Sequence, residues 1–224
     1  MKKAVCLISG GLDSAVTAYI AKAKGYEIYA ITFRYGQRHV KEIRSSKLIS
    51  DSLNAKEHIY FDINLSQFKG SSLIDKTKKI EEKKLGQIGK KIPSTYVPAR
   101  NTIFLSVALA YAEVMKADAI FIGITATDYS GYPDCRPEYI HSFKKMANLA
   151  TKRAIEGAPV EIISPLIDLS KSEIIKKGMK LNVPFENTWS CYRGEKKACG
   201  RCDSCKLRLN GFKKAGLKDP LEYQ

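Results

Sequence analysis

Long hydrophobic runs are missing from this chain of 224 residues. No run reaches the roughly 18 apolar residues that a membrane-spanning helix needs. The N-terminal apolar stretch stops after five residues at Ser9-Gly10-Gly11, which is too short for a secretory signal. Hydrophobic residues nevertheless make up 44% of the chain, enough for a full core. We therefore expect a globular protein without a membrane partner, located in the cytoplasm.

Acidic residues are scarce relative to basic ones. The chain has 23 Asp and Glu residues and 38 Lys and Arg residues, which gives a net charge of +15. This excess of positive charge would suit binding to a polyanion such as tRNA or nucleotide phosphates. The lysines are scattered along the chain, however, which favours a solvated surface and no direct nucleic-acid partner. The densest run, 76–91, also holds two glutamates and two glycines, and it predicts a loop whose role the sequence leaves open.

Metal-ligating residues are few but concentrated. Four of the six cysteines are Cys191, Cys199, Cys202 and Cys205, spaced C-x₇-C-x₂-C-x₂-C. Paired C-x₂-C thiolates suit one tetrahedral Zn²⁺, and four protein ligands leave no open position, so we expect a structural zinc site. An iron–sulfur cluster uses similar spacing and stays an alternative, while a cytosolic setting disfavours disulfides.

The order of apolar segments predicts an α/β fold. Short buried runs rich in β-branched residues alternate with segments of helical periodicity, which favours a Rossmann-like open parallel sheet with helices on both faces. The expected strands are 3–8, 27–33, 57–63, 119–123 and 160–163, and the expected helices are 12–24, 37–53, 102–116 and 137–154. We assign residues 1–165 to this nucleotide-binding domain. Residues 166–224, which open with a capping box from Ser170 to Glu173, form a small helical zinc-binding appendage.

A loop of glycine and hydroxyl residues joins the first strand to the first helix. It reads Ser9-Gly10-Gly11-Leu12-Asp13-Ser14. The glycines allow a sharp turn, and the free N–H groups of the helix start attract an anion such as a phosphate. Asp13 is a candidate ligand for Mg²⁺ carried by a nucleotide. The loop lacks the lysine of a Walker motif and the G-x-G-x-x-G pattern of a dinucleotide site.

Three further polar segments follow strands or precede a helix. They are 33–39, 96–101 and 128–138. Open α/β sheets bind ligands at the carboxyl ends of their strands, so we expect all three at one site. Cys135 lies in the third segment as a possible nucleophile, but the sequence shows no fixed neighbour that would lower its pKa.

The phosphate loop resembles the SGGxDS signature of the PP-loop ATP pyrophosphatases. Together with the three polar segments and the cysteine spacing, the chain closely resembles the 7-cyano-7-deazaguanine synthase family of queuosine biosynthesis, from Ser9 to Asp219-Pro220. One position departs from the family pattern: Ala99 stands where a glycine is expected.

The resemblance implies a carbon–nitrogen ligase. It would use ATP and ammonia to convert 7-carboxy-7-deazaguanine to 7-cyano-7-deazaguanine through adenylated acid and amide intermediates, as a homodimer. Asp13, Ser14, Arg100 and Arg136 would be catalytic, and Ser9, Gly10, Gly11, Leu12, Asp13, Ser14, Thr32 and Phe33 would bind ATP with Mg²⁺. The expected substrate-binding residues are Gln37, Arg38, His39, Asn101, Asp128, Tyr132 and Asp134.

Two other functions fit parts of the sequence. A tRNA-thiolating PP-loop enzyme would explain the charge and the cysteines, but it needs a sulfur-carrying cysteine, and only Cys135 is placed to serve. A zinc-ribbon binding module without catalysis would not need the intact loop from Ser9 to Ser14. We therefore favour the synthase over both alternatives.

Overall fold

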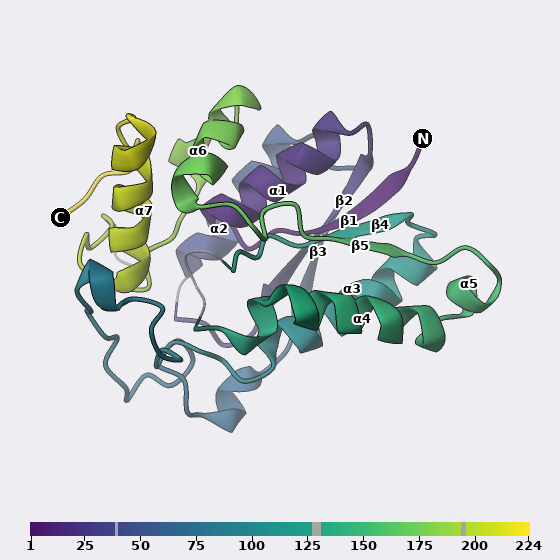
Figure 1. The fold of residues 1–224 in the computed structure, drawn as a ribbon, viewed down its shortest axis with the longest axis horizontal. Coiled ribbons are helices and arrows are strands. Elements are labelled where there is room, and N and C mark those ends of the chain that lie inside the picture. The colour runs from purple at the N-terminus through teal and green to yellow at the C-terminus, as the bar shows by residue number, and fades with distance from the viewer. Residues whose placement is uncertain (39, 127–130, 194–195) are drawn as a thin grey trace.

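A computed structural model describes residues 1–38, 40–126, 131–193 and 196–224. Within these ranges five parallel strands form one sheet in the order β3-β2-β1-β4-β5 (Figure 1). The strands are β1 (Lys3–Leu7), β2 (Glu27–Arg34), β3 (Glu57–Asp62), β4 (Ala119–Phe121) and β5 (Glu161–Ile163). The strand order reverses direction between β1 and β4. At such a switch point the connections leave on opposite faces, which opens a crevice at the carboxyl ends of the strands.

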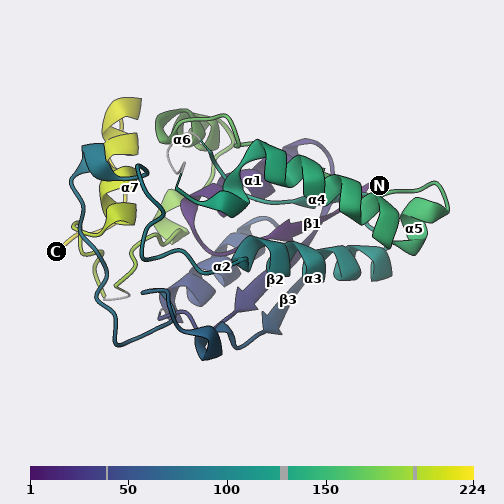
Figure 2. The same ribbon diagram turned by 60° about the horizontal axis from the view of Figure 1, so that its bottom comes forward.

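Alternating side chains of the strands build a core on each face of the sheet. On β1, Val5 and Leu7 pack with α3 (Arg100–Val114) and α4 (Pro137–Ala150). Ala4 and Cys6 point to the opposite face and pack with α1 (Leu12–Ala23) and α2 (Val40–Ser52). Figures 1 and 2 show the two pairs of helices on the two faces. The expected Rossmann-like architecture is confirmed.

Several helix bounds differ from those expected. The helix expected over 137–154 is divided, because Thr151 adopts an extended conformation (φ −114°, ψ 141°) before the short helix α5 (Lys152–Ile155). The helix α3 starts at Arg100, two residues earlier than expected, and α2 starts at Val40 rather than at Gln37. The aperiodic segment 64–96 contains two single turns of 3₁₀-helix, η1 (Leu65–Phe68) and η2 (Leu85–Gln87).

The C-terminal part consists of α6 (Lys171–Lys180), the turn η4 (Phe185–Asn187) and α7 (Asp203–Ala215). The capping box is confirmed: the Ser170 hydroxyl accepts a hydrogen bond from Glu173 N, and the Glu173 carboxylate accepts one from Ser170 N. Ile174 and Ile175 of α6 are fully buried in the same core cluster as α1. Helix α7 lies beyond the carboxyl ends of the strands (Figure 1), so this part of the chain borders the crevice.

The part of the chain that the structure describes contains no helix long and apolar enough to cross a membrane.

Candidate active site

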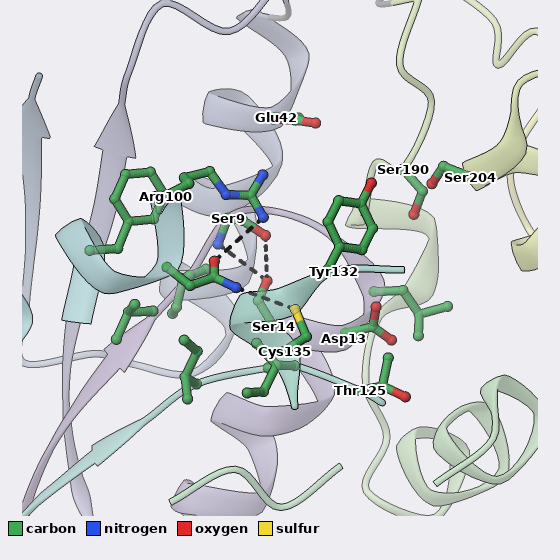
Figure 3. Close-up of a pocket in the computed structure, with 18 of the residues that line it drawn as sticks. Ser9, Asp13, Ser14, Glu42, Arg100, Thr125, Tyr132, Cys135, Ser190 and Ser204 are labelled. Atoms are coloured by element: carbon green, nitrogen blue, oxygen red, sulfur yellow. Dashed lines mark hydrogen bonds between the residues drawn. The ribbon is translucent and has the colours of Figure 1, made fainter. Parts of the chain in front are cut away.

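A cavity of about 260 Å³ opens at the carboxyl ends of β1, β2 and β4 (Figure 3). Its wall combines the phosphate loop, an aromatic group, several charged side chains and residues from the C-terminal part. The described residues with polar or aromatic side chains in this wall are Ser9, Asp13, Ser14, Phe33, Tyr35, Gln37, Glu42, Arg100, Asn101, Phe104, Thr125, Tyr132, Cys135, Lys171, Ser190, Tyr192, Ser204 and Arg208. Segments that are far apart in sequence therefore meet at the switch point, as expected for an open parallel sheet.

The loop from Ser9 to Ser14 is preorganised by its own hydroxyl groups. The Ser9 hydroxyl donates to Ser14 Oγ at 3.0 Å, and Ser14 Oγ donates to the Gly11 carbonyl at 3.0 Å. Gly10 has a φ of +84°, and a Cβ there would lie 2.2 Å from the Glu42 carbonyl oxygen, so the loop and α2 meet closely only with glycine at this position. Leu12, Asp13 and Ser14, at the start of α1, line the cavity. The N–H groups of a first helical turn have no partner within the helix, so this position suits an anion.

Asp13 is held by a lysine that the sequence did not suggest. The Lys171 ammonium, from the first turn of α6, donates to both Asp13 carboxylate oxygens, at 2.6 and 2.8 Å. Both residues line the cavity. Residues in the C-terminal part are therefore in direct contact with the phosphate loop.

Arg100 enters the cavity over an aromatic group. Its guanidinium carbon lies 5.9 Å from the ring centre of Tyr35 and 6.0 Å from that of Phe104. Phe104 in turn stacks on Phe33, with ring centres 4.0 Å apart and planes 4° apart. Burial raises the pKa of Tyr35 to about 12, so its phenol stays neutral beside the guanidinium. A planar heterocycle carrying a carboxylate matches this combination of rings and positive charge.

The turn before Arg100 shows why glycine would be favoured at position 99. Ala99 adopts a left-handed conformation with a φ of 53° and a ψ of 21°. A residue with a Cβ is strained in this region, by roughly 1–2 kcal/mol, whereas glycine enters it freely. Glycine would thus adopt the helix start that presents Arg100 with less strain than Ala99 does.

Glu42 of α2 adds an acid to the wall of the cavity. Removal from bulk water raises its pKa to about 7, although the positive charge of Arg100 acts in the opposite direction. A carboxyl group that titrates near neutral pH can exchange protons with a ligand. Nothing in the sequence singles out Glu42, because it looks like an ordinary helical glutamate.

Three of the expected substrate-binding residues lie in the wall of the cavity: Gln37, Asn101 and Tyr132. The Gln37 amide is tied to its own loop, accepting from Tyr35 N at 2.7 Å and donating to the Phe33 carbonyl at 3.0 Å. Asp134 is buried outside the wall, and its carboxylate accepts a hydrogen bond from Asn101 N at 3.0 Å. It therefore fixes the start of α3.

Other expected site residues point elsewhere. The Thr32 hydroxyl is buried and donates to the Ile8 carbonyl at 2.6 Å. The guanidinium of Arg38 donates to the carbonyl oxygens of Asp75 and Lys78, and the exposed Arg136 donates to its own loop at the Pro133 carbonyl. His39 and Asp128 lie outside the described residues.

Cys135 lines the cavity as a protonated thiol. Burial, followed by the nearby negative charge of Asp134, raises its pKa to about 12. Its sulfur accepts a hydrogen bond from Asn101 Nδ2 at 3.3 Å. A nucleophilic cysteine needs the opposite electrostatic setting, with a lowered pKa.

The four clustered cysteines form a candidate metal site. Their sulfur atoms all lie within 4.8 Å of one another, and all four residues are buried. A tetrahedron of Zn–S bonds of about 2.3 Å places sulfur atoms about 3.8 Å apart, close to this arrangement. Backbone N–H groups of Arg193 and Cys199 donate to Cys191 Sγ, both at 3.4 Å, as suits a thiolate ligand. The residues present fit a metal ion held by four sulfurs.

The lysine-rich segment 76–91 packs against this cysteine cluster. Ile80 is part of the apolar group around the four sulfurs. The backbone N–H of Lys83 donates to the Asp203 carboxylate at 2.8 Å, and the Lys206 ammonium donates to the Lys83 carbonyl at 2.7 Å. The segment thus packs against both the cysteine cluster and the start of α7.

The fold and the loop together define a class: Rossmann-like α/β proteins that hold a phosphate group at a glycine-serine loop after the first strand. Comparison with known families narrows this class. The family described as "Queuosine biosynthesis protein QueC" matches residues 3–216. The chain belongs to this family.

Relatives of known name cover nearly the whole chain. The chain is 55% identical over 222 residues to a protein of Syntrophus aciditrophicus named 7-cyano-7-deazaguanine synthase, covering 98% of this chain and 96% of the relative. A protein of the same name from Trichodesmium erythraeum is 52% identical, covering 98% of this chain and 99% of the relative.

Solved structures support the fold alone. An NMN synthetase from Francisella tularensis has a TM-score of 0.50 at 18% identity, covering 97% of this chain and 78% of that protein. A 4-thiouridine synthetase in complex with RNA and ATP has a TM-score of 0.52 at 18% identity, covering 96% of this chain and 50% of that protein.

Proposed function

We propose that the chain converts 7-carboxy-7-deazaguanine and ammonia to 7-cyano-7-deazaguanine at the expense of two ATP. Membership of the family carries the proposal, and the cavity supports it. The phosphate loop and Arg100 line the same cavity, so a nucleotide phosphate and the carboxylate of the substrate would bind side by side there.

The reaction starts with activation of the acid. A carboxylate oxygen of the substrate attacks the α-phosphorus of ATP, the bond to the β-phosphate breaks, and pyrophosphate leaves. Ammonia then attacks the acyl carbon, AMP leaves with the former carboxylate oxygen, and the nitrogen loses a proton to give the amide. These steps need positioning and charge stabilisation more than covalent help from the protein.

The second activation removes the remaining oxygen. The amide oxygen attacks the α-phosphorus of another ATP, and pyrophosphate leaves again. Loss of AMP and of both nitrogen protons gives the nitrile. Glu42, with its pKa near 7, faces the cavity as a candidate acceptor for these protons.

We assign the following roles as part of this proposal. Ser9, Gly10, Gly11, Leu12 and Ser14 would hold the pyrophosphate part of ATP, while Asp13 would hold Mg²⁺, which neutralises phosphate charge when bound. Phe33, with Phe104, offers a flat apolar surface for one of the two heterocycles. Arg100 would neutralise the substrate carboxylate. Gln37, Asn101 and Tyr132 would contact the deazapurine.

We also propose one structural Zn²⁺ per chain, held by the four cysteines. Four buried sulfur ligands leave no position open for a reacting group, and no step of the reaction needs electrons. Metal analysis that finds iron with labile sulfide would contradict this assignment.

The division of the chain at residue 165, the cytoplasmic location and the homodimer stay predictions. Among the described apolar side chains, Val114, Leu149 and Ile155 are at least 73% exposed, on the neighbouring helices α3, α4 and α5, and a dimer interface would be expected to cover them. Light scattering at micromolar concentration tests the dimer.

The decisive experiment measures products. Protein incubated with ATP, ammonia and 7-carboxy-7-deazaguanine should release AMP and pyrophosphate and form the nitrile, with little dependence on salt. Formation of ADP would refute the adenylation chemistry. Sulfur incorporated into tRNA, together with tight tRNA binding at physiological salt, would instead support the thiolating alternative. That alternative needs a nucleophilic cysteine, and the raised pKa of Cys135 disfavours this role.

A further inference from the structure

The phosphate loop is held from outside by the segment that leads into the cysteine cluster. The Trp189 N–H donates to the Gly10 carbonyl at 2.8 Å. The Trp189 carbonyl oxygen also lies 3.7 Å from the position that a Cβ at Gly11 would occupy, so the two backbones are in contact. Two parts of the chain that are remote in sequence therefore meet at the loop.

A glycine loop depends on such a contact for its shape. Gly10 has a φ of +84°, and glycine has more accessible backbone conformations than other residues. The peptide bond is planar, so a hydrogen bond that fixes the Gly10 carbonyl also fixes the direction of the Gly11 N–H. The contact with Trp189 therefore restrains the part of the backbone that would surround a phosphate.

Trp189 is in turn part of the cysteine cluster. It is 5% exposed and packs in the apolar group that contains all four cysteines. The indole N–H donates to the Cys191 carbonyl at 3.1 Å. From α2, the Lys41 ammonium lies 3.8 Å from the centre of the ring and donates to the Lys196 carbonyl. The indole is thus held by the backbone of a candidate metal ligand on one side and by α2 on another.

The segment from Trp189 to Tyr192 contributes to both sites. Trp189 and Cys191 are buried in the cysteine cluster, whereas Ser190 and Tyr192 line the cavity, where Figure 3 shows Ser190. The candidate metal ligand Cys191 is therefore two residues from the contact with the phosphate loop. A metal that fixes the Cys191 sulfur would also restrain Trp189, because the indole N–H bond ties the two residues together.

We propose that Trp189 is a positioning residue that couples the four-cysteine site to the phosphate loop, so that bound Zn²⁺ raises the affinity for ATP. The inference rests on the proposed function, which supplies both ligands. Coupling between two binding sites is reciprocal, so ATP must raise the affinity for Zn²⁺ by the same factor. Such couplings are typically about 5–150-fold, and we expect at least about fivefold here.

The test compares Trp189→Ala with Tyr223→Ala, both loaded with zinc and checked by metal analysis. Each variant removes an aromatic ring that packs on the cysteine cluster, but Tyr223 donates to Asp219, near the end of the chain. In isothermal titration calorimetry, Trp189→Ala should bind ATP at least about fivefold more weakly than the wild type. Tyr223→Ala should stay within about twofold, as expected for an independent site. Equal ATP affinity of the two variants would overturn the proposal.

Trp189→Phe distinguishes positioning from a general loss of structure. Phenylalanine keeps the backbone N–H and a ring that packs on the cluster, so it should restore most of the ATP affinity that Trp189→Ala loses. Because a positioning residue acts on the nucleotide site rather than on the reacting atoms, Trp189→Ala should raise the KM for ATP more than it lowers kcat. A Trp189→Phe variant that binds ATP as weakly as Trp189→Ala would count against positioning by the ring.

Competition with a chromogenic chelator measures the other half of the coupling in the wild type. Saturating Mg·ATP should raise the affinity for Zn²⁺ at least about fivefold. Trp189 is the only tryptophan of the chain, so its fluorescence reports this segment alone. Its emission should shift to the red when zinc is removed and back when ATP is added. A zinc affinity that does not respond to the nucleotide would overturn the coupling, even if Trp189→Ala does not fold.

The coupling and the proposed function can fail separately, because none of these titrations needs the acceptor substrate. Nitrile formation together with ATP binding that does not depend on zinc would overturn the coupling alone. Zinc-dependent ATP binding without nitrile formation would support the coupling and overturn the proposed function.

Discussion

The buried ion pair between Arg208 and Asp219 offers a quantitative test of the C-terminal part. The Asp219 carboxylate accepts from Arg208 Nε at 2.8 Å and from Nη2 at 3.0 Å, and each side chain is 2% exposed. The same guanidinium donates to the Thr188 hydroxyl at 2.7 Å and to the Phe185 carbonyl at 3.1 Å. It therefore ties the end of the chain to the segment that leads into the cysteine cluster.

Asp219→Ala removes the negative partner and leaves a buried guanidinium uncompensated. Breaking such a pair costs about 3–5 kcal/mol, because the remaining charge has lost its solvent and its counter-charge. For a domain of this size each kcal/mol lowers the Tm by about 2–4 °C, so we expect a decrease of roughly 6–20 °C. This loss is a large part of the about 5–15 kcal/mol that typically separates folded from unfolded states.

Glu222→Ala provides the matched control in the same segment. Glu222 pairs with Lys197 at 3.3 Å, but their side chains are 78% and 56% exposed. Solvent screens such a pair, so its loss should cost about 0–1 kcal/mol. Urea denaturation at saturating zinc measures the free energy of unfolding of both variants, provided that the slope m is unchanged. If Asp219→Ala were no less stable than Glu222→Ala, the reasoning from burial would be refuted.

Four further outcomes test the site. Asp13→Ala should keep the wild-type circular dichroism spectrum but lose turnover, and a near wild-type rate at saturating Mg·ATP would contradict its role. Cys202→Ser should lower the bound zinc, measured by elemental analysis, and the Tm, because binding of a structural metal contributes folding energy. Ala99→Gly should leave stability unchanged or raise it by up to about 1 kcal/mol in urea denaturation, since relief of the left-handed strain at Ala99 exceeds the added entropy of the unfolded chain. Cys135 has a pKa of about 12, so at pH 8 only about one thiol in 10⁴ is ionised. Its alkylation by iodoacetamide, followed by mass spectrometry, should therefore be slow until the pH rises or guanidinium unfolds the protein.

The sequence by itself determined the local elements and the residues whose chemistry depends on close spacing. Buried strands alternating with helices predict the parallel sheet because their periodicities are local properties of the chain. Ser170 and Glu173 predict the start of α6 because a capping box is complete within four residues. The loop from Ser9 to Ser14 and the C-x₂-C pairs can likewise be recognised from the sequence, since each brings its groups together within one turn of backbone.

Only the tertiary structure decided which distant side chains share the cavity. Lys171 reads as a helix-start lysine and Glu42 as a surface glutamate, yet the packing of α6 and α2 around the switch point places both in the wall. The resemblance placed Thr32 among the ATP-binding residues, but in the structure its hydroxyl donates to the Ile8 carbonyl. The physical reason is the same in each case: a side chain's direction depends on strand register and helix packing, which are set by contacts between residues far apart in sequence.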